Sequence, residues 1–326
     1  MVECLRCPDD QGKLRLCRTT DDIAPALECD TCGNRYPVVN RIPRFVVSEN
    51  YANTFGFQWN QFRKTQLDSF SGITLSKDRF YQQCKLKPED LKGKTVLDTG
   101  CGAGRFTEIA LQAGATVYAV DFSSAVDACR ENHASSETLH VVQADIYRLP
   151  FSENQFDYIY CFGVLQHTPN VREAFLKLPR YLKPGGGICV DIYLKRWHRK
   201  FHPKRLLRPL TKRIEKKKLF CLIQWAAPVL LGLNRGLRLI PVVGRFAIRM
   251  VPIADYTGMY GLDRQKIREW SILDTFDWLS PEYDSPQTAA TLQEWMEYAK
   301  LENIEVEVHG FVVGRATKAD LTSGTG

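Results

Sequence analysis

The sequence predicts an α/β protein with a mostly parallel sheet in its middle, a small N-terminal metal ribbon and a helical insertion near its end. Three observations lead to this prediction. Short apolar runs alternate with amphipathic stretches from Lys94 onward, at the spacing of strand–helix–strand units. Two Cys-x2-Cys pairs stand close to the N-terminus, and a stretch that is both basic and apolar interrupts the alternating pattern at residues 195–252.

The composition is that of a soluble globular protein, because 44% of the 326 residues are apolar and 25% are charged. Disorder, collagen and a coiled coil are therefore excluded as the main architecture. The net charge of +7 is unevenly distributed. Residues 195–252 hold sixteen Lys or Arg and one acid, Glu215, which gives this segment +15 and leaves −8 for the rest of the chain. A basic segment on an acidic body indicates a local contact with an anionic partner.

The two cysteine pairs are Cys4-x2-Cys7 and Cys29-x2-Cys32, with 21 residues between them. Two such pairs bring four thiolates into tetrahedral reach, which suits Zn²⁺, and four cysteine ligands leave no open position for catalysis. We therefore predict a structural zinc ribbon over residues 1–45, in which the metal supplies much of the folding free energy. The alternatives are iron in place of zinc, or reduced cysteines that cluster by chance. Short strands are expected at residues 13–17, 26–29 and 35–39.

No export signal is expected, because charged residues and cysteines interrupt any apolar stretch at the N-terminus. The longest apolar run without charges, residues 219–233, has 15 residues and contains Pro228, whereas a spanning helix needs about 20. We therefore expect no transmembrane segment. Eleven cysteines without an export signal are interpreted as reduced thiols or metal ligands, which predicts a cytoplasmic protein.

Residues 46–92 are rich in aromatic side chains with polar residues between them, and they are expected to form a helical cap. One interpretation is a cap that only packs on the next domain. The other is a lid that closes over a cofactor and contributes Tyr51 or Trp59 to its site. The two interpretations are compatible.

A glycine-rich turn follows the first strand of the central pattern, with Gly100, Gly102 and Gly104. These glycines let the backbone turn tightly and approach a ligand closely. The dinucleotide fingerprint G-x-G-x-x-G/A would need a small residue at position 105, which is Arg105 here. The turn therefore favours a ligand that contains adenosine but no diphosphate.

Acidic residues stand at the ends of the first three strands of the pattern: Asp98, Asp121 and Asp145. The carboxyl ends of parallel strands meet at the edge where open α/β sheets bind ligands. Asp121 lies 17 residues after Gly104, where a carboxylate at a strand tip accepts both ribose hydroxyls. Together with the glycine turn, these acids predict a nucleoside site at this edge.

Residues 94–193 resemble a class I S-adenosylmethionine-dependent methyltransferase. The resemblance rests on VLDTGCGAGRFT, AVDFS, ADIYRLPF, FDYIYCFGVLQHTPN and LKPGGGICVDIY. It implies a Rossmann-like, seven-stranded and mostly parallel sheet that ends in an antiparallel C-terminal hairpin, for which residues 304–308 and 311–317 are suited. It also implies S-adenosyl-L-methionine as cofactor and S-adenosyl-L-homocysteine as product. The run YPVVNRIP at residues 36–43 resembles small zinc ribbons that accompany some methyltransferases.

The resemblance also assigns cofactor roles, with the glycine turn flanking the methionine part. It implies that Asp98 points toward the methionine amino group, that Asp121 holds the ribose, and that Phe162 lies near the sulfonium. Asp145 and Ile146 are expected to contact adenine. The full set of expected cofactor contacts is Asp98, Gly100, Cys101, Gly102, Gly104, Asp121, Phe122, Asp145, Ile146, Phe162, Tyr51 and Trp59.

The expected domain boundaries follow from these patterns. An insertion between the fifth and sixth strands of this fold usually covers the acceptor site, so acceptor specificity is expected there and in the cap. The expected parts after the cap are the core with strands one to five at 93–194, the insertion at 195–262, the end of the core at 263–319 and a disordered tail at 320–326.

Four side chains are candidates for the chemistry: His167, Asp277, Tyr283 and Tyr256. His167 follows the fourth strand, where the family places active-site groups, and it is a candidate general base. The alternative is a loop histidine whose nitrogens are satisfied by the backbone. We expect Asp277, Tyr283 or Tyr256 to touch the acceptor. Alternatively, Tyr283 packs the insertion onto the core.

The predicted function is methyl transfer to a small-molecule, lipid-linked or glycan-linked acceptor. Residues 195–252 combine cations with apolar runs, the pattern of a segment that lies on an anionic bilayer, which places the protein at the inner membrane face as a peripheral protein. An RNA methyltransferase that grips phosphates is a less favoured alternative. A catalytically silent binding protein is the alternative from another class. Methylation of oxygen, nitrogen or carbon stays open at this point.

Overall fold

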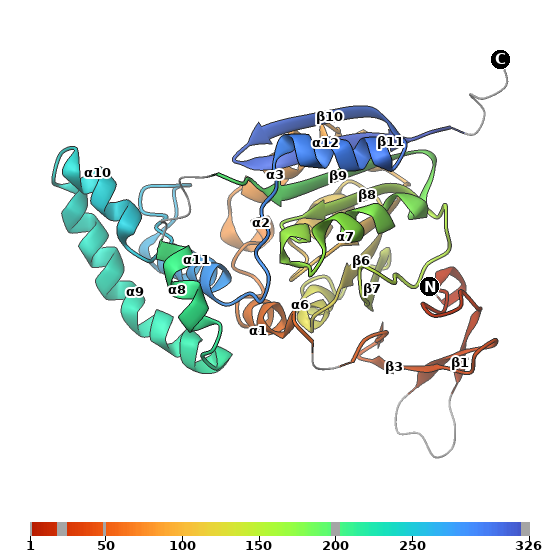
Figure 1. Ribbon diagram of the computed structural model, residues 1–326. Helices are drawn as coiled ribbons and strands as arrows, with labels where there is room; N and C mark the ends of the chain where they lie inside the picture. The colour runs from red at the N-terminus through yellow and green to blue at the C-terminus, as the bar shows by residue number, and fades with distance from the viewer. Residues whose placement is uncertain (1, 18–24, 48–49, 197–202, 321–326) are drawn as a thin grey trace.

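Figure 1 shows the computed structural model, which describes residues 2–17, 25–47, 50–196 and 203–320. Its centre is a seven-stranded sheet in the order β7-β6-β5-β8-β9-β11-β10. This order and the parallel pairing from β5 to β9 confirm the predicted Rossmann-like sheet. The strands are β5 (Thr95–Thr99), β6 (Thr116–Asp121), β7 (Leu139–Gln143), β8 (Phe156–Phe162), β9 (Leu182–Tyr193), β10 (Leu301–His309) and β11 (Phe311–Lys318).

Helices cover both faces of the sheet, which explains why its central strands are apolar on both sides. In β6, Val117 and Ala119 belong to one core cluster, whereas Tyr118 and Val120 belong to the other, because side chains alternate along a strand. The first cluster includes side chains of α5 (Arg105–Gln112) and α6 (Ala125–Asn132), and the second those of α7 (Val171–Lys177) and α12 (Ala289–Tyr298).

The C-terminal strands form the predicted antiparallel hairpin. β10 and β11 pair antiparallel, and β11 also pairs antiparallel with β9. The hairpin turns at Gly310, whose φ of +76° lies in the region that glycine adopts without strain. The hairpin thus closes the β9 side of the sheet.

The N-terminal residues form a separate antiparallel sheet that lies against the β7 side of the large one (Figure 1). After it, Arg44 forms a parallel bridge to Gln143 at the end of β7, and the N–H of Phe45 donates to the Gln143 carbonyl at 2.8 Å. Arg44 also pairs with Asp127 of α6 at 2.6 Å. The strands of this N-terminal sheet are β1 (Leu14–Cys17), β2 (Ala26–Cys29), β3 (Arg35–Val39) and β4 (Ile42–Pro43).

Residues 53–91 form the predicted helical cap, and the later helices add a second helical layer beside it (Figure 1). α11 packs on α8, on α9 and on α1, with Phe276 against Phe57 and Phe220. By its packing, α11 belongs with the insertion, whereas the sequence predicts that the insertion ends at residue 262, before this helix. The helices are α1 (Asn53–Gln61), α2 (Asp68–Ser71), α3 (Leu75–Cys84), α4 (Pro88–Leu91), α8 (Pro203–Thr211), α9 (Lys216–Arg238), α10 (Val243–Ala247) and α11 (Arg264–Leu279).

Candidate functional site

A cavity of about 370 Å³ lies at the carboxyl ends of β5, β6 and β8. It is lined by the turns and segments that follow these three strands and by helices α1, α3 and α11. Its volume lies in the range of small-molecule sites. The predicted site residues that line it are Tyr51, Trp59, Gly100, Cys101, Gly102, Asp121, Phe122, Ile146, Phe162, His167, Tyr256 and Asp277.

The glycine turn after β5 is held between α1 and α6. Gly100, Gly102 and Gly104 all have positive φ, at +83°, +52° and +89°. A Cβ on Gly104 would lie 2.6 Å from Nε2 of His133, and one on Gly102 would lie 3.2 Å from the indole nitrogen of Trp59. Glycine thus permits both the backbone conformation and the close approach of its neighbours. Gly104 itself begins α5 and is not among the cavity residues.

Asp121 ends β6 with both of its carboxylate oxygens fixed. One oxygen accepts the N–H of Gly102 at 3.0 Å, and the other accepts the N–H and the hydroxyl of Ser123 at 2.8 and 2.7 Å. Burial raises the pKa of Asp121, although these hydrogen bonds act to lower it. Since a carboxylate has about four acceptor sites, this oriented side chain can still accept hydroxyl groups from a ligand.

The part of the cavity next to Asp121 has an apolar and aromatic lining. Phe122, Ile146 and Tyr51 line it, and the rings of Tyr51 and Phe122 lie 4.9 Å apart. Asp145 is not among the cavity residues, and its carboxylate accepts the N–H of Tyr147 at 3.0 Å. Of the two residues expected at the adenine, the geometry therefore favours Ile146.

Asp98 lies behind the glycine turn instead of facing the cavity. It is 3% exposed, is not among the cavity residues, and accepts the hydroxyl of Thr107 at 2.6 Å. Burial raises the pKa of Asp98 to about 7, although the bond from Thr107 opposes this. In this structure the Asp98 side chain joins β5 to α5, and its expected approach to a methionine amino group stays a prediction.

The end of the cavity near α3 contains a half-buried cation. Arg105 donates to the Ser76 hydroxyl at 2.8 Å and to the Gln66 side-chain carbonyl at 3.0 Å, both of them neutral acceptors. Burial lowers the pKa of Arg105 to about 10, and the nearby Arg79 adds to this effect. No acidic side chain of the described residues forms an ion pair with Arg105. A ligand carboxylate would complete this site.

A buried amide also lies in the wall of this cavity. Gln58 of α1 is fully buried and lines it, and neither polar atom of its amide has a hydrogen-bond partner within the described part of the chain. Buried polar groups without hydrogen-bond partners are rare, which makes this amide unusual, but its polar atoms are closed off from the cavity.

His167 lies in the short 3-10 helix Leu165–His167 and is almost fully buried. Its Nδ1 lies 2.9 Å from the carbonyl oxygen of Tyr283, which can only accept, so the proton is on Nδ1 and Nε2 keeps its lone pair. Burial lowers the pKa of His167, which keeps the ring neutral at pH 7. Tyr283 packs its ring on Tyr51 and is not among the cavity residues. Tyr283 thus contacts His167 through its backbone carbonyl, and a contact between its side chain and an acceptor stays a prediction.

Two acids of α11 face the same cavity. Asp277 accepts the hydroxyl of Tyr193 at 3.2 Å, and Asp274 accepts the hydroxyl of Tyr256 in a very short hydrogen bond. Burial raises the pKa of Asp274 to about 6, although the bond from Tyr256 opposes this. A carboxylate with a pKa near neutrality is suited to accept a proton during catalysis.

Sequence reasoning missed several cavity residues, among them Asp274, Arg105, Arg79 and Gln58. For Asp274 a signal existed, because it precedes Asp277 by three residues on a helix and so shares its face. Arg105 directly follows the glycine turn, at a helix start that reaches a bound ligand. For Arg79 and Gln58 there was no signal, since both reach the cavity only through the packing of the cap.

The insertion contributes less to the cavity than expected. Only Tyr256 and Tyr260 of residues 203–262 line it, and α8, α9 and α10 lie behind α11. Several of the cations are used for internal contacts. Lys204 pairs with Asp284, Lys212 with Glu282 and Arg238 with Asp255, while Arg208 donates to the carbonyls of Trp278 and Pro281.

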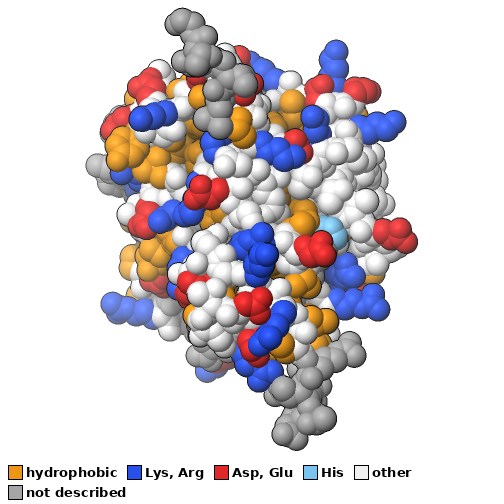
Figure 2. All heavy atoms as spheres, turned by 90° about the vertical axis from the view of Figure 1, so that its right-hand side faces the viewer, with side chains coloured by type: hydrophobic (Ala, Val, Ile, Leu, Met, Phe, Trp, Pro, Cys, Tyr) orange, Lys and Arg blue, Asp and Glu red, His pale blue; other side chains and the backbone are white. Residues whose placement is uncertain are grey.

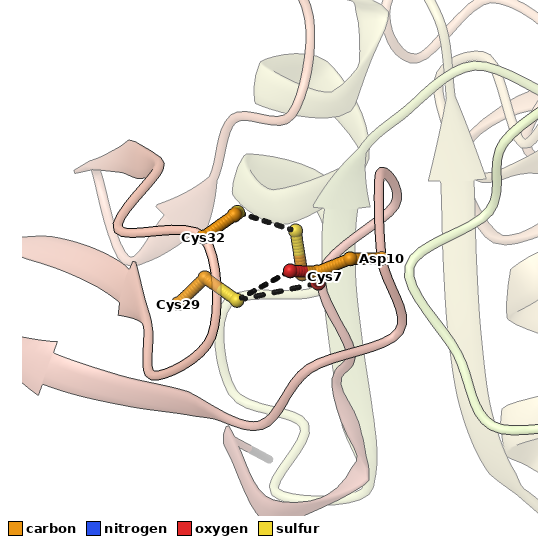
Figure 3. Close-up of side chains that lie close together, drawn as sticks. All are labelled: Cys7, Asp10, Cys29 and Cys32. Carbon is orange, nitrogen blue, oxygen red and sulfur yellow. Dashed lines mark hydrogen bonds between the residues drawn. The ribbon is translucent and has the colours of Figure 1, made fainter.

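The N-terminal sheet brings together three cysteines and one acid, as Figure 3 shows. The donor atoms of Cys7, Asp10, Cys29 and Cys32 all lie within 4.8 Å of one another. The sulfurs of Cys7 and Cys32 lie 3.7 Å apart, and Cys29 Sγ lies 3.3 and 3.6 Å from the Asp10 oxygens. Tetrahedral Zn²⁺ with Zn–S bonds of about 2.3 Å places two sulfurs about 3.8 Å apart, so the spacing fits that metal.

Cys4 is not part of this group, which corrects the predicted ligand set. Its side chain is partly buried against the core cluster that contains Tyr118. Cys7-x2-Asp10 has the same spacing as a Cys-x2-Cys pair, so the first pair of ligands is displaced by three residues. A Cβ on Gly12 would lie 2.6 Å from Cys29 Sγ and 2.9 Å from the Asp10 carboxylate, so a glycine is needed beside the cluster.

Comparison with known proteins agrees with this geometry. Residues 97–190 match the family model of the methyltransferase domain. The strand order and the glycine turn with Asp121 agree with this match and support a class I S-adenosylmethionine-dependent methyltransferase domain in the middle of the chain.

The curated relatives match over a similar length of the chain. Ubiquinone biosynthesis O-methyltransferase of Coxiella burnetii (strain Dugway 5J108-111) is 37% identical over 100 residues, which are 30% of this chain and 43% of that protein. Phosphoethanolamine N-methyltransferase 2 of Caenorhabditis elegans is 31% identical over 109 residues, 32% of this chain and 24% of that protein. The chain thus spans less than half the length of these relatives.

Solved structures superpose only partially. An O-methyltransferase family protein from Burkholderia thailandensis has a TM-score of 0.45 at 12% identity, over 76% of this chain and 57% of that one. Phosphoethanolamine N-methyltransferase 1 of Haemonchus contortus, in complex with phosphoethanolamine and S-adenosylhomocysteine, has a TM-score of 0.37 at 21% identity, over 46% of this chain and 34% of that one.

Proposed function

We propose that the protein transfers a methyl group from S-adenosylmethionine to a hydroxyl group of a small acceptor that has an aromatic or apolar body. The observation that carries this proposal is the presence of Asp274, Asp277 and His167 in the same cavity as the glycine turn and Asp121. When bound, S-adenosylmethionine supplies an electrophilic methyl group. The residues of this chain have to orient the acceptor, exclude water and take up the hydroxyl proton.

The cofactor side of the cavity fits S-adenosylmethionine by its donor and acceptor chemistry. Asp121 accepts the ribose hydroxyls, and Phe122 and Ile146 take the adenine between apolar side chains. Arg105 has only neutral partners among the described side chains, and it pairs with the methionine carboxylate. Trp59 packs on the glycine turn and shields the cofactor from water.

On the acceptor side, the acids of α11 line the cavity together with the aromatic side chains of Tyr193, Trp270 and Trp278. An acceptor hydroxyl must lose its proton as it attacks, and Asp274, with a pKa of about 6, is ionised at neutral pH and able to accept it. His167 is the second candidate base, since its Nε2 is unprotonated. An amine acceptor needs no such base once it is neutral, so this pair of proton acceptors favours oxygen as the methylated atom.

The curated relatives include enzymes that methylate oxygen and enzymes that methylate nitrogen. They include an O-methyltransferase of ubiquinone biosynthesis and an N-methyltransferase of phosphoethanolamine, each of which matches about a third of this chain. Their acceptors differ, so the acceptor has to be inferred from the residues outside the match. In this chain those residues are the aromatic and acidic side chains of α11 and of the segment before it.

The test is a search for the labelled product. The protein is incubated with methyl-labelled S-adenosylmethionine and cell extract, and the lipid and aqueous phases are analysed separately by mass spectrometry. We expect one labelled small molecule that loses the label on treatment specific for methyl ethers, and a rate about 10²–10⁴-fold lower with Asp274→Asn. Label only in RNA would support the RNA methyltransferase instead, and no label in any fraction, despite cofactor binding, would support the catalytically silent protein.

We also propose that Cys7, Asp10, Cys29 and Cys32 hold a structural Zn²⁺. Three thiolates and a carboxylate satisfy a tetrahedral zinc ion without leaving an open position. The metal joins the loop after β2 to the turn that precedes β1, and so stabilises a sheet that is too small to bury a core of its own. Elemental analysis of the purified protein tests this proposal.

A further inference from the structure

One face of α9 is apolar and exposed. Leu222, Trp225, Val229 and Leu233 have exposed fractions of 52%, 76%, 67% and 50%. Their spacing of three and four residues places them in one stripe along the helix. The buried side chains of α9, among them Phe220, lie on another face and pack on α1 and α11. The exposed stripe is therefore not an extension of the core.

The turn after α9 and helix α10 add further exposed apolar side chains. Together with the stripe on α9 they form what we call the α9–α10 surface. The additional members are Leu239, Ile240, Val242, Val243, Phe246 and Met250. Monomeric soluble proteins rarely expose so many large apolar side chains on neighbouring elements without a partner.

The charges around the α9–α10 surface are nearly all positive. Arg213, Lys217 and Arg235 are exposed, and none of them has an acidic partner among the described residues. Within residues 203–252, Glu215 is the only acid, and it lies 3.3 Å from Lys218. By contrast, Figure 2, which views the opposite side of the molecule, shows acidic and basic side chains intermingled.

We propose that the α9–α10 surface docks on a lipid bilayer that contains anionic lipids, with α9 lying along the bilayer surface. Exposed Trp225 beside cations is the combination that suits the interface between acyl chains and anionic headgroups. A second copy of the chain is a poorer occupant, because a symmetric contact would bring the same cations face to face.

The length of α9 does not make it a membrane span. It is the one helix of the described residues that is long and apolar enough to cross a membrane. However, Ile223 and Ala227 are buried on its other face in the cluster that also holds Phe276 of α11. Crossing would require α9 to leave this cluster, whereas lying along the surface keeps it intact.

Docking would bring the bilayer close to the candidate active site. α11 lies between α9 and the cavity, with Phe276 packed on Phe220 and with Asp274 and Asp277 lining the cavity. An acceptor dissolved in the bilayer would then have a short path to the acids of α11. The docking itself does not rest on the proposed reaction, because it is measured without any acceptor.

The test is flotation of the full chain with vesicles of phosphatidylcholine alone and of phosphatidylcholine with one quarter phosphatidylglycerol. We expect binding to the anionic vesicles that weakens as salt is raised. Trp225→Ser with Val229→Ser should lower the partition coefficient about a hundredfold, since each buried apolar side chain is worth roughly tenfold or more. The matched control is Leu16→Ser with Tyr298→Ser, two exposed apolar residues elsewhere, which should bind as the wild type does.

A second pair of variants tests the charges. Lys217→Glu with Arg235→Glu should lower binding to anionic vesicles at least about 25-fold, at about fivefold per charge. Lys92→Glu with Lys300→Glu, which has the same charge change at exposed sites, should have little effect. Calorimetry with S-adenosylmethionine verifies that each variant is folded. The proposal would be overturned if the wild-type protein did not bind anionic vesicles, or if Trp225→Ser with Val229→Ser bound them as well as the wild type does. It would also be overturned if the protein formed a dimer in solution that those two substitutions dissociate.

Discussion

Asp274→Asn should stabilise the folded protein at alkaline pH while it removes the candidate base. Burial raises the pKa of Asp274 to about 6, so ionising it costs about 2 to 3 kcal/mol more in the folded protein than in the unfolded chain. Because the folded pKa is the higher one, the stability contributed by the protonated form is complete below about pH 4 and is lost as the pH rises through 6. Asparagine accepts from Tyr256 without carrying a charge, so the variant avoids this loss.

The assay is thermal unfolding of wild type and Asp274→Asn between pH 4 and pH 8. The melting temperature of the variant should exceed that of the wild type by a few degrees at pH 8, and the advantage should shrink as the pH falls below 6. The control with opposite sign is Asp157→Asn. Although burial opposes it, the N–H of Thr95 and the ammonium of Lys183 hold the pKa of Asp157 below its usual value, so that variant should lose stability at pH 8. A pH-independent difference for Asp274→Asn would refute the assigned environment.

Three further predictions concern the cofactor, the metal and the glycine turn. Asp121→Ala should weaken S-adenosylmethionine binding in calorimetry at least about a hundredfold, because two hydrogen bonds to a charged group are lost at about 1.5–3 kcal/mol each; unchanged affinity would contradict the ribose assignment. Asp10→Ala should leave well under about half an equivalent of zinc, whereas Cys4→Ser should keep about one; the reverse result would restore the sequence-based ligand set. Gly104→Ala should be less stable than Gly93→Ala by about 1–3 kcal/mol in denaturant titrations. Both glycines have positive φ, but an added Cβ would meet a side chain only at Gly104. Equal losses of stability in the two variants would argue that backbone strain alone decides.

The arrangement of strands could be predicted because it depends on local patterns. The apolar runs at β5, β6 and β7 are short, regularly spaced and followed by amphipathic helices, so their parallel pairing followed from chain connectivity. The glycine turn and Asp121 were also recognisable, since the residue types themselves carry the chemistry. Each of these features lies in a short stretch of sequence, and no contact between distant segments is needed to interpret it.

Features that depend on packing between distant segments were harder to predict. Asp10 competes with Cys4 for a place beside Cys7 at equal spacing, and only the fold of the turn decides between them. Arg79 reaches the cavity because α3 packs on α5, which its own sequence neighbours do not reveal. The basic residues of the insertion looked available for a partner, but several of them, such as Arg208, hold the loop after α11.

The way in which the N-terminal sheet sits beside β7 has a consequence for solubility. A strand at the border of a sheet presents unpaired amides and carbonyls that can template the addition of another chain. Here the backbone of Arg44 and Phe45 engages Gln143 at the tip of β7, and the small sheet lies next to it. Unfolding of the small sheet would therefore also affect the large sheet. It would uncover a hydrogen-bonding border of the catalytic domain, so precipitation is the expected sign of damage at the cysteine cluster.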